Sequence, residues 1–201
     1  MPDTPPMLTQ TGRYSPLRYP GGKGKLARFM KEIVRSNGLS DGRYVEPYAG
    51  GAAVAWELLL TGVVRRVSIN DISLPVFSFW HSVLNSTDEL CGLIRNCRLT
   101  VEEWDRQKEV FRRPEEADCL SLGFSFFFLN RTNRSGILNG GVIGGRAQTG
   151  KWKIDARFNK PDLISRIEKI ASLRSRIEVT NLDAIDFIEK NLHKFKNTVL
   201  V

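Results

Sequence analysis

The chain has 201 residues, of which 41% are hydrophobic and 26% charged, as expected of a globular protein with one sizeable core or a core with an inserted subdomain. Lysine and arginine outnumber aspartate and glutamate by 30 to 22, so the net charge is +8. This excess of positive charge either keeps the protein in solution or serves a polyanionic partner. The longest apolar run, Val54 to Val64, contains Glu57 and is too short to cross a bilayer, which argues against a membrane protein.

The cysteines argue against a metal site, and the N-terminal residues argue against a signal peptide. Cys91, Cys97 and Cys119 are odd in number and form no C-x-x-C pair, and the chain has only two histidines. We therefore expect no metal site and a reducing, cytoplasmic setting. Residues 1–12 are rich in Pro and Thr and lack the basic-then-apolar pattern of a signal peptide, so they are predicted to form a flexible tail.

The first predicted element is a glycine turn followed by a helix. Pro20-Gly-Gly22 precedes residues 25–36, whose apolar positions recur at helical spacing. Glycines ahead of a helix N-terminus, with Lys23 beside them, can hold an anionic group. No hydroxyl residue follows Lys23 at Walker A spacing, and a capped surface turn is the alternative interpretation.

Residues 43–60 are predicted to form the central strand, turn and helix of a nucleotide-binding α/β sheet. A β-branched and aromatic run leads into a turn from Pro47 to Gly51, and an Ala- and Leu-rich helix follows. The small residues of the turn let backbone N–H groups approach a ligand, although the G-x-G-x-x-G spacing is absent.

The next strand, residues 66–70, ends at Asp71, about twenty residues after the glycine turn. An acid at this place can accept hydrogen bonds from ribose hydroxyls, and a helix N-cap is the alternative role. Residues 73–84 are predicted to be helical, and their aromatic stripe is interpreted as core.

Residues 85–159 are predicted to form an inserted, mainly helical region. Residues 85–118 have helical, amphipathic periodicity, and the apolar run 120–129 indicates a buried helix. The segment 130–146 is polar and basic and carries five glycines, which predicts a flexible loop that reaches into a groove; a disordered surface loop is the alternative. Seven Lys or Arg against one Asp between residues 120 and 160, and a similar excess between 12 and 35, favour DNA as the partner.

The remaining residues return to the α/β pattern. We predict a helix over 161–174, a third strand over 177–180, a short helix over 184–192 and a fourth strand over 198–201. Residues 13–84 and 160–201 are therefore expected to form one cofactor-binding core around the insertion.

Together these pieces resemble the Dam-type class of adenine-specific DNA methyltransferases, which use S-adenosylmethionine. Four segments carry the resemblance, in the family's order: Arg18-Tyr-Pro-Gly-Gly-Lys23, Val45-Glu-Pro-Tyr-Ala-Gly-Gly51, Asn70-Asp71 and Phe126-Phe-Phe-Leu-Asn-Arg-Thr-Asn-Arg-Ser-Gly136. The implied fold is a Rossmann-like parallel sheet, incomplete at the C-terminus, with a helical recognition insertion. The implied activity is N6-adenine methylation of double-stranded DNA, as in restriction-modification systems.

The resemblance also implies the site residues. Those for S-adenosylmethionine are Tyr19, Lys23, Glu46, Pro47, Gly50, Gly51, Asp71 and Asp183. Tyr19 would stack on the adenine or cover the methionine end, Lys23 would pair with the carboxylate, and Asp71 would take the ribose hydroxyls. Asp183 is equally well explained as a helix N-cap.

The DNA-contact residues implied by the resemblance are Asn130, Arg131, Asn133, Arg134, Lys151 and Lys153, with Arg157 beside them. Arginine and asparagine in the loop suit base edges or the space left by a flipped adenine, whereas Lys151, Lys153 and Arg157 suit phosphates.

One departure from the family pattern affects the expected activity. No Asp-Pro-Pro or Asn-Pro-Pro occurs in the 201 residues, so the D-P-P-Y catalytic motif is missing and no catalytic residue is predicted. We expect an N-terminal part of a methyltransferase that is inactive alone, with a second chain as a possible completion of the sheet. The alternatives are a catalytically silent DNA- or cofactor-binding subunit and, outside the family, a nicotinamide-nucleotide protein.

Overall fold

The computed structural model describes residues 14–18, 23–191 and 198–201. The predicted tail 1–12, the glycine turn 20–22 and Tyr19 lie outside these residues. No helix in the described ranges is long and apolar enough to cross a membrane.

Four parallel strands form the sheet, in the order β3-β2-β1-β4. The strands are β1 (Arg43–Glu46), β2 (Arg66–Asn70), β3 (Ile177–Thr180) and β4 (Thr198–Leu200). Val45 of β1 lies opposite Ser68 of β2 on one side and Leu200 of β4 on the other. All four strands were predicted, and the parallel sheet with surrounding helices confirms the Rossmann-like α/β fold.

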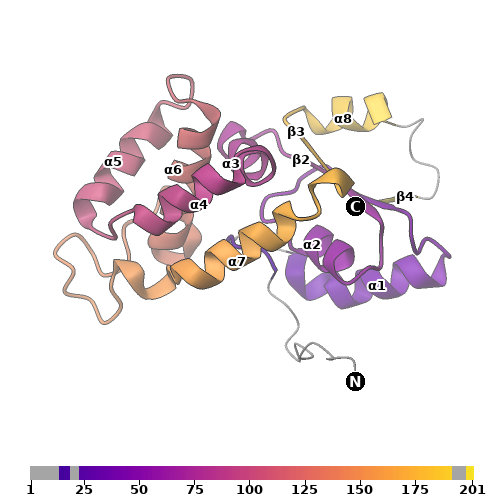
Figure 1. Ribbon diagram of the computed structural model, residues 1–201, viewed down its shortest axis with the longest axis horizontal. Coiled ribbons are helices and arrows are strands. Elements are labelled where there is room, and N and C mark those ends of the chain that lie inside the picture. The colour runs from indigo at the N-terminus through magenta and orange to yellow at the C-terminus, as the bar shows by residue number, and fades with distance from the viewer. Residues whose placement is uncertain (1–13, 19–22, 192–197) are drawn as a thin grey trace.

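The strand order reverses between β1 and β4. The chain moves outward from β1 to β2 to β3 and then returns across the sheet to place β4 beside β1. Figure 1 shows helix α8 on the side of the sheet opposite to α1 and α2, as expected when right-handed crossovers run in opposite directions. Such a reversal opens a crevice outside the carboxyl end of β1, which is where α/β sheets bind ligands.

The helices agree closely with the periodicity of the sequence. They are α1 (Ala27–Ser36), α2 (Ala53–Leu60), α3 (Leu74–Asn85), α4 (Thr87–Asn96), α5 (Val101–Arg112), α6 (Cys119–Thr132), α7 (Lys160–Ala171) and α8 (Ala184–Asn191), with 3₁₀ turns η1 (Lys23–Leu26), η2 (Arg134–Gly136), η3 (Ile154–Arg157) and η4 (Arg174–Arg176). Helices α4, α5 and α6 gather beside the sheet, and α7 runs back towards it (Figure 1).

The core joins the sheet to the helical part through α3 and α6. The Phe79 ring of α3 stacks on the Phe127 ring of α6 with centroids 5.3 Å apart. Gly123 lets the two helices approach, since a Cβ at this position would lie 2.7 Å from the Ser78 carbonyl oxygen. The aromatic stripe of α3 is therefore core, as predicted, and the apolar helix 120–129 is buried.

Candidate functional site at the carboxyl edge of the sheet

The glycine turn after β1 and the acid after β2 are joined by a hydrogen bond. The Gly50 N–H donates to Asp71 Oδ2 over 2.8 Å, and the Ser73 N–H donates to Asp71 Oδ1 over 2.9 Å. Gly50 and Ala52 both have a φ of 47°, in the left-handed region that favours glycine. Trp80 Nε1 of α3 holds the other side of the turn by donating to the Gly50 carbonyl. The turn is thus tied to β2 and to α3.

Asp71 does not cap α3 directly, because the N-cap position is Ser73. Its carboxylate orders the chain just before the helix and remains partly exposed at the sheet edge. Each carboxylate oxygen accepts one hydrogen bond and keeps a further lone pair for a ligand hydroxyl.

Glu46, the last residue of β1, is a buried acid at the same edge. Lys23 Nζ donates to Glu46 Oε1 over 2.9 Å, whereas Glu46 Oε2 is buried and has no hydrogen-bond partner among the residues that the structure describes. Burial raises the pKa of Glu46 above its usual range, although Lys23 and the Ala55 amide of α2 favour the charged form and Asp71 opposes it. A buried oxygen without a partner is unusual and indicates a place where a ligand donor binds.

Asn70 connects the three loops that follow β1, β2 and β3. Its Nδ2 donates to the carbonyls of Pro47 and Leu182, and its Oδ1 accepts from the Thr180 hydroxyl and the Leu182 N–H. Because all of its hydrogen-bonding capacity is used inside the protein, Asn70 positions the site rather than contacting a ligand.

Asp183 follows β3 and is exposed, and its Oδ1 accepts from the Ile185 N–H at the start of α8. This contact is that of a helix cap, the alternative that the sequence left open.

The structure therefore gathers Lys23, Glu46, Gly50 and Asp71 at one edge, as the sequence predicted, with Pro47 and Gly51 in the same turn. Two exposed apolar side chains at this edge, Tyr48 and Ile72, were not predicted as site residues. Each lies two residues beyond a strand end, and this position next to a predicted ligand site was the signal that could have identified them.

Two of the predicted DNA-contact residues are buried, which makes that prediction wrong for both. Helix α6 continues to Thr132, so Asn130 lies within it and Asn133 directly after it, 1% and 0% exposed. Asn130 Oδ1 accepts from the Arg18 N–H, and its Nδ2 donates to the Arg18 and Gly136 carbonyls. These bonds fasten the segment before residue 19 to the base of the loop.

Asn133 organises the loop itself. Its Oδ1 accepts from Trp104 Nε1 of α5, and its Nδ2 donates to the carbonyls of Ile137 and Leu138. An antiparallel bridge from Asn133 to Val142 adds to this framework, and Val142 and Ile143 are buried. The segment 130–146 is therefore packed and hydrogen-bonded, in contrast to the flexible loop expected from its glycines.

Arg131 also binds within the protein. Its guanidinium donates to the Arg157 carbonyl through Nε and Nη2 and to the Pro16 carbonyl through Nη1. Burial, with the neighbouring charges of Arg18, Arg166 and Arg157, lowers the pKa of Arg131 to about 10. By contrast, Arg134, Lys151 and Lys153 are exposed, and Lys153 Nζ donates to the Gln148 carbonyl.

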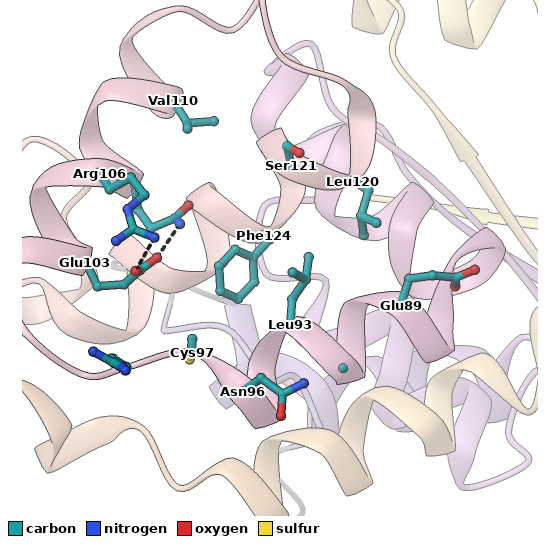
Figure 2. Close-up of a pocket in the computed structure, with 13 residues that line it drawn as sticks. Glu89, Leu93, Asn96, Cys97, Glu103, Arg106, Val110, Leu120, Ser121 and Phe124 are labelled. Carbon is teal, nitrogen blue, oxygen red and sulfur yellow. Dashed lines mark hydrogen bonds and ion pairs between the residues drawn. The ribbon is translucent and has the colours of Figure 1, made fainter.

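A cavity of about 740 Å³ lies in the helical part, away from the sheet edge. Leu93 of α4 and Phe124 of α6 face each other in it, and Arg106 pairs with Glu103 at one side (Figure 2). Within the described residues, no cluster of three or more His, Cys, Asp or Glu could hold a metal ion.

Comparisons with known proteins agree with this geometry. The type II methyltransferase M.MjaIII of Methanocaldococcus jannaschii is 27% identical over 135 residues, which cover 60% of this chain and 46% of the relative. The chain thus spans about half the length of that curated relative. The family model of the D12 class N6 adenine-specific DNA methyltransferases matches residues 19–195. The chain therefore belongs to the D12 class of N6 adenine-specific DNA methyltransferases.

Proposed function

We propose that this chain binds S-adenosylmethionine at the carboxyl edge of its sheet and duplex DNA on its basic loop, in the service of N6-adenine methylation. The observation that carries the proposal is Glu46 Oε2, a buried carboxylate oxygen beside Lys23 and the glycine turn that no donor in residues 14–18, 23–191 or 198–201 reaches.

The residues at this edge fit the cofactor's chemistry. The methionine end carries an ammonium that Glu46 Oε2 would accept from, and a carboxylate that the remaining N–H donors of Lys23 would bind. Asp71 would accept from the ribose hydroxyls, and Tyr48 and Ile72 offer apolar surface for a flat base. When bound, the cofactor supplies the methyl group on its sulfonium.

This assignment gives the two parts of the chain different roles. We propose that residues 13–84 and 160–201 form the cofactor-binding core and residues 85–159 the recognition region. The loop at its end exposes Arg134, Lys151 and Lys153, which suit phosphates and base edges. The target adenine has to leave the duplex, because pairing and stacking bury its amino nitrogen.

Calorimetric titration with S-adenosylmethionine tests the cofactor site. Glu46→Gln removes the charge that would pair with the ammonium, so we expect affinity to fall by roughly tenfold or more. Glu57→Gln is the matched control, because Glu57 also forms an ion pair with a lysine, Lys31, but between α1 and α2. Equal affinity of Glu46→Gln and the unaltered chain would reject the site, and tighter binding of NAD would favour a nicotinamide-nucleotide protein.

Fluorescence anisotropy with a labelled duplex tests the DNA partner. Each phosphate contact should add about 0.9 to the slope of log affinity against log salt. We expect steep salt dependence, and Arg134→Ala should weaken binding; an affinity that does not change with salt would contradict a DNA-binding role.

A second candidate is a binding subunit without chemistry of its own. The observation that favours it is that β4 lies at the edge of the sheet in the described part of the chain and has an exposed Leu200. A strand from another chain would pair along such an edge. Transfer of a labelled methyl group to an adenine-containing duplex by the chain alone would reject this candidate, whereas binding of both ligands without transfer would support it.

A further inference from the structure

Trp152 differs from the other tryptophans of the chain in its exposure. Three of the four, Trp56, Trp80 and Trp104, are 0%, 1% and 5% exposed, whereas Trp152 is 58% exposed. A single exposed apolar side chain is common on protein surfaces. An exposed tryptophan is informative when its neighbours point to a partner, because tryptophan is among the residues enriched at interfaces.

The neighbours of Trp152 are cations. Lys151 Nζ lies 5.8 Å from the centre of the Trp152 ring, and the Arg157 guanidinium lies 5.7 Å from it. Among the residues that the structure describes, no carboxylate forms an ion pair with Lys151, Lys153 or Arg157. Arg146, which is also exposed, is by contrast paired with both oxygens of Asp105. The segment 151–157 thus carries three cations without an ion pair in the described part of the chain, against one acid, Asp155.

A framework of internal hydrogen bonds holds the backbone on either side of Trp152. Gln148 donates to the carbonyls of Ile143 and Gly145 and accepts from the Ile154 N–H. Two segments cross closely here, since a Cβ on Gly144 would lie 2.7 Å from the Trp152 carbonyl oxygen. A surface that is ordered before binding loses less conformational entropy when a partner docks.

Like charges accumulate next to this segment. Arg131 donates to the Arg157 carbonyl, and burial, with the charges of Arg18, Arg166 and Arg157, lowers the pKa of Arg131 while the charge of Asp162 raises it. Burial and the charge of Arg157 lower the pKa of Arg18. A polyanion would relieve this repulsion and would gain affinity from it.

We propose that Trp152 packs against a nucleotide of bound duplex DNA, while Lys151, Lys153 and Arg157 hold the phosphates on either side of it. An aromatic face accepts any base or sugar, so this contact contributes affinity and position rather than sequence preference. The inference rests on the proposed DNA-binding function and adds to it a contact residue that the basic side chains alone do not reveal.

Acrylamide quenching of tryptophan fluorescence tests the contact in the full 201-residue chain. Since the other three tryptophans are buried, most of the fluorescence that this neutral quencher reaches comes from Trp152. A saturating 20-base-pair duplex should remove most of the quenchable fraction. Trp152→Phe should lose that fraction with or without DNA, which confirms the assignment of the signal.

Anisotropy with the same duplex gives the contribution to affinity. Trp152→Ala is expected to weaken binding by roughly tenfold, and Trp152→Phe by roughly threefold or less because an aromatic ring remains. Ile185→Ala is the matched control, because Ile185 is an exposed apolar side chain at the start of α8, outside both basic stretches of the sequence. It should leave DNA affinity unchanged.

The outcomes separate this inference from the proposed function. If the chain binds the duplex with steep salt dependence but Trp152 stays fully quenchable, or Trp152→Ala binds as tightly as the unaltered chain, the contact is wrong and the DNA-binding function stands. An equal loss for Ile185→Ala would also overturn it. If no duplex binding occurs at any salt concentration, the proposed function itself fails.

Discussion

Replacing Asn130 with alanine removes three hydrogen bonds from the junction between the N-terminal segment and the recognition loop. Two of them are short, at 2.8 Å from the Arg18 N–H and 2.7 Å to the Arg18 carbonyl, and the third is 3.3 Å long, to the Gly136 carbonyl. A net hydrogen bond contributes about 1 kcal/mol, and a buried group left without a partner costs about 1–3 kcal/mol. We therefore expect Asn130→Ala to lower the free energy of unfolding by about 3 kcal/mol.

Urea denaturation followed by circular dichroism measures this change. With a slope of about 3 kcal/mol per molar urea, the midpoint should fall by about 1 M. Asn139→Ala is the control, because Asn139 lies in the same loop but is exposed, and its stability should change by less than about 0.5 kcal/mol. A loss under 1 kcal/mol for Asn130→Ala, or equal losses for both variants, would refute the structural role assigned to this amide.

Asn130→Asp adds a pH test of the same contacts. A carboxylate oxygen in place of Nδ2 would face the carbonyls of Arg18 and Gly136, so this variant should be less stable than Asn130→Ala at pH 8. These surroundings raise the pKa of the new carboxyl in the folded state. Its penalty is therefore present at high pH and is relieved as pH falls and the proton restores a donor. Equal stability deficits at pH 5 and pH 8 would contradict this.

Three further predictions concern Glu46 and two glycines. Because burial raises the pKa of Glu46, the folded state holds the carboxyl proton more tightly than the unfolded state. The chain should therefore lose stability as pH rises from about 4.5 through the folded-state pKa of Glu46. Glu46→Gln should reduce this dependence of stability on pH, measured by thermal melts without cofactor. Gly136→Ala should lower the free energy of unfolding in urea by about 3 kcal/mol or more, since φ is 75° and a Cβ would collide with the Arg18 carbonyl. Gly38→Ala is the control, because φ is 64° but the space around Gly38 is open, and it should cost about 1 kcal/mol. Gly123→Ala should destabilise the protein by about 1–3 kcal/mol, because the new Cβ would push α3 and α6 apart. Gly92→Ala, in α4 with no neighbour within 4 Å, should instead stabilise the protein by up to about 1 kcal/mol. Changes of the same sign for both variants would contradict the packing argument.

The sheet could be predicted because its signals are local. Each strand is a short β-branched run, and the glycine turn after β1 and Asp71 after β2 follow their strands directly. Parallel strands bring their carboxyl ends to one edge, so residues 21 positions apart, Gly50 and Asp71, were expected to meet, and they do. The prediction for Tyr19 remains untested, because that residue lies outside the described part of the chain.

The roles of the amides could not be predicted, because they depend on distant contacts. Polar residues in a basic, glycine-rich stretch are normally exposed, and nothing near Asn130 in sequence reveals Arg18, 112 residues away. Trp104 Nε1, 29 residues before Asn133, is likewise the partner that makes burial of that amide favourable. Composition identified a basic loop correctly, but it could not separate the side chains that build the loop from those that face outward.

The long excursion of the chain between β2 and β3 has a consequence for folding kinetics. The chain leaves the sheet at Asn70 and returns at Ile177, so β3 can pair with β2 only after a loop of more than a hundred residues has closed. For a disordered loop of that length, closure would cost roughly 4 kcal/mol of chain entropy. Helices α3 to α7 pack on one another, α3 on α6 and α4 on α7, and once folded they bring the two ends together. We therefore expect a lesion in the helical region to slow formation of the sheet, even though none of its residues belongs to a strand.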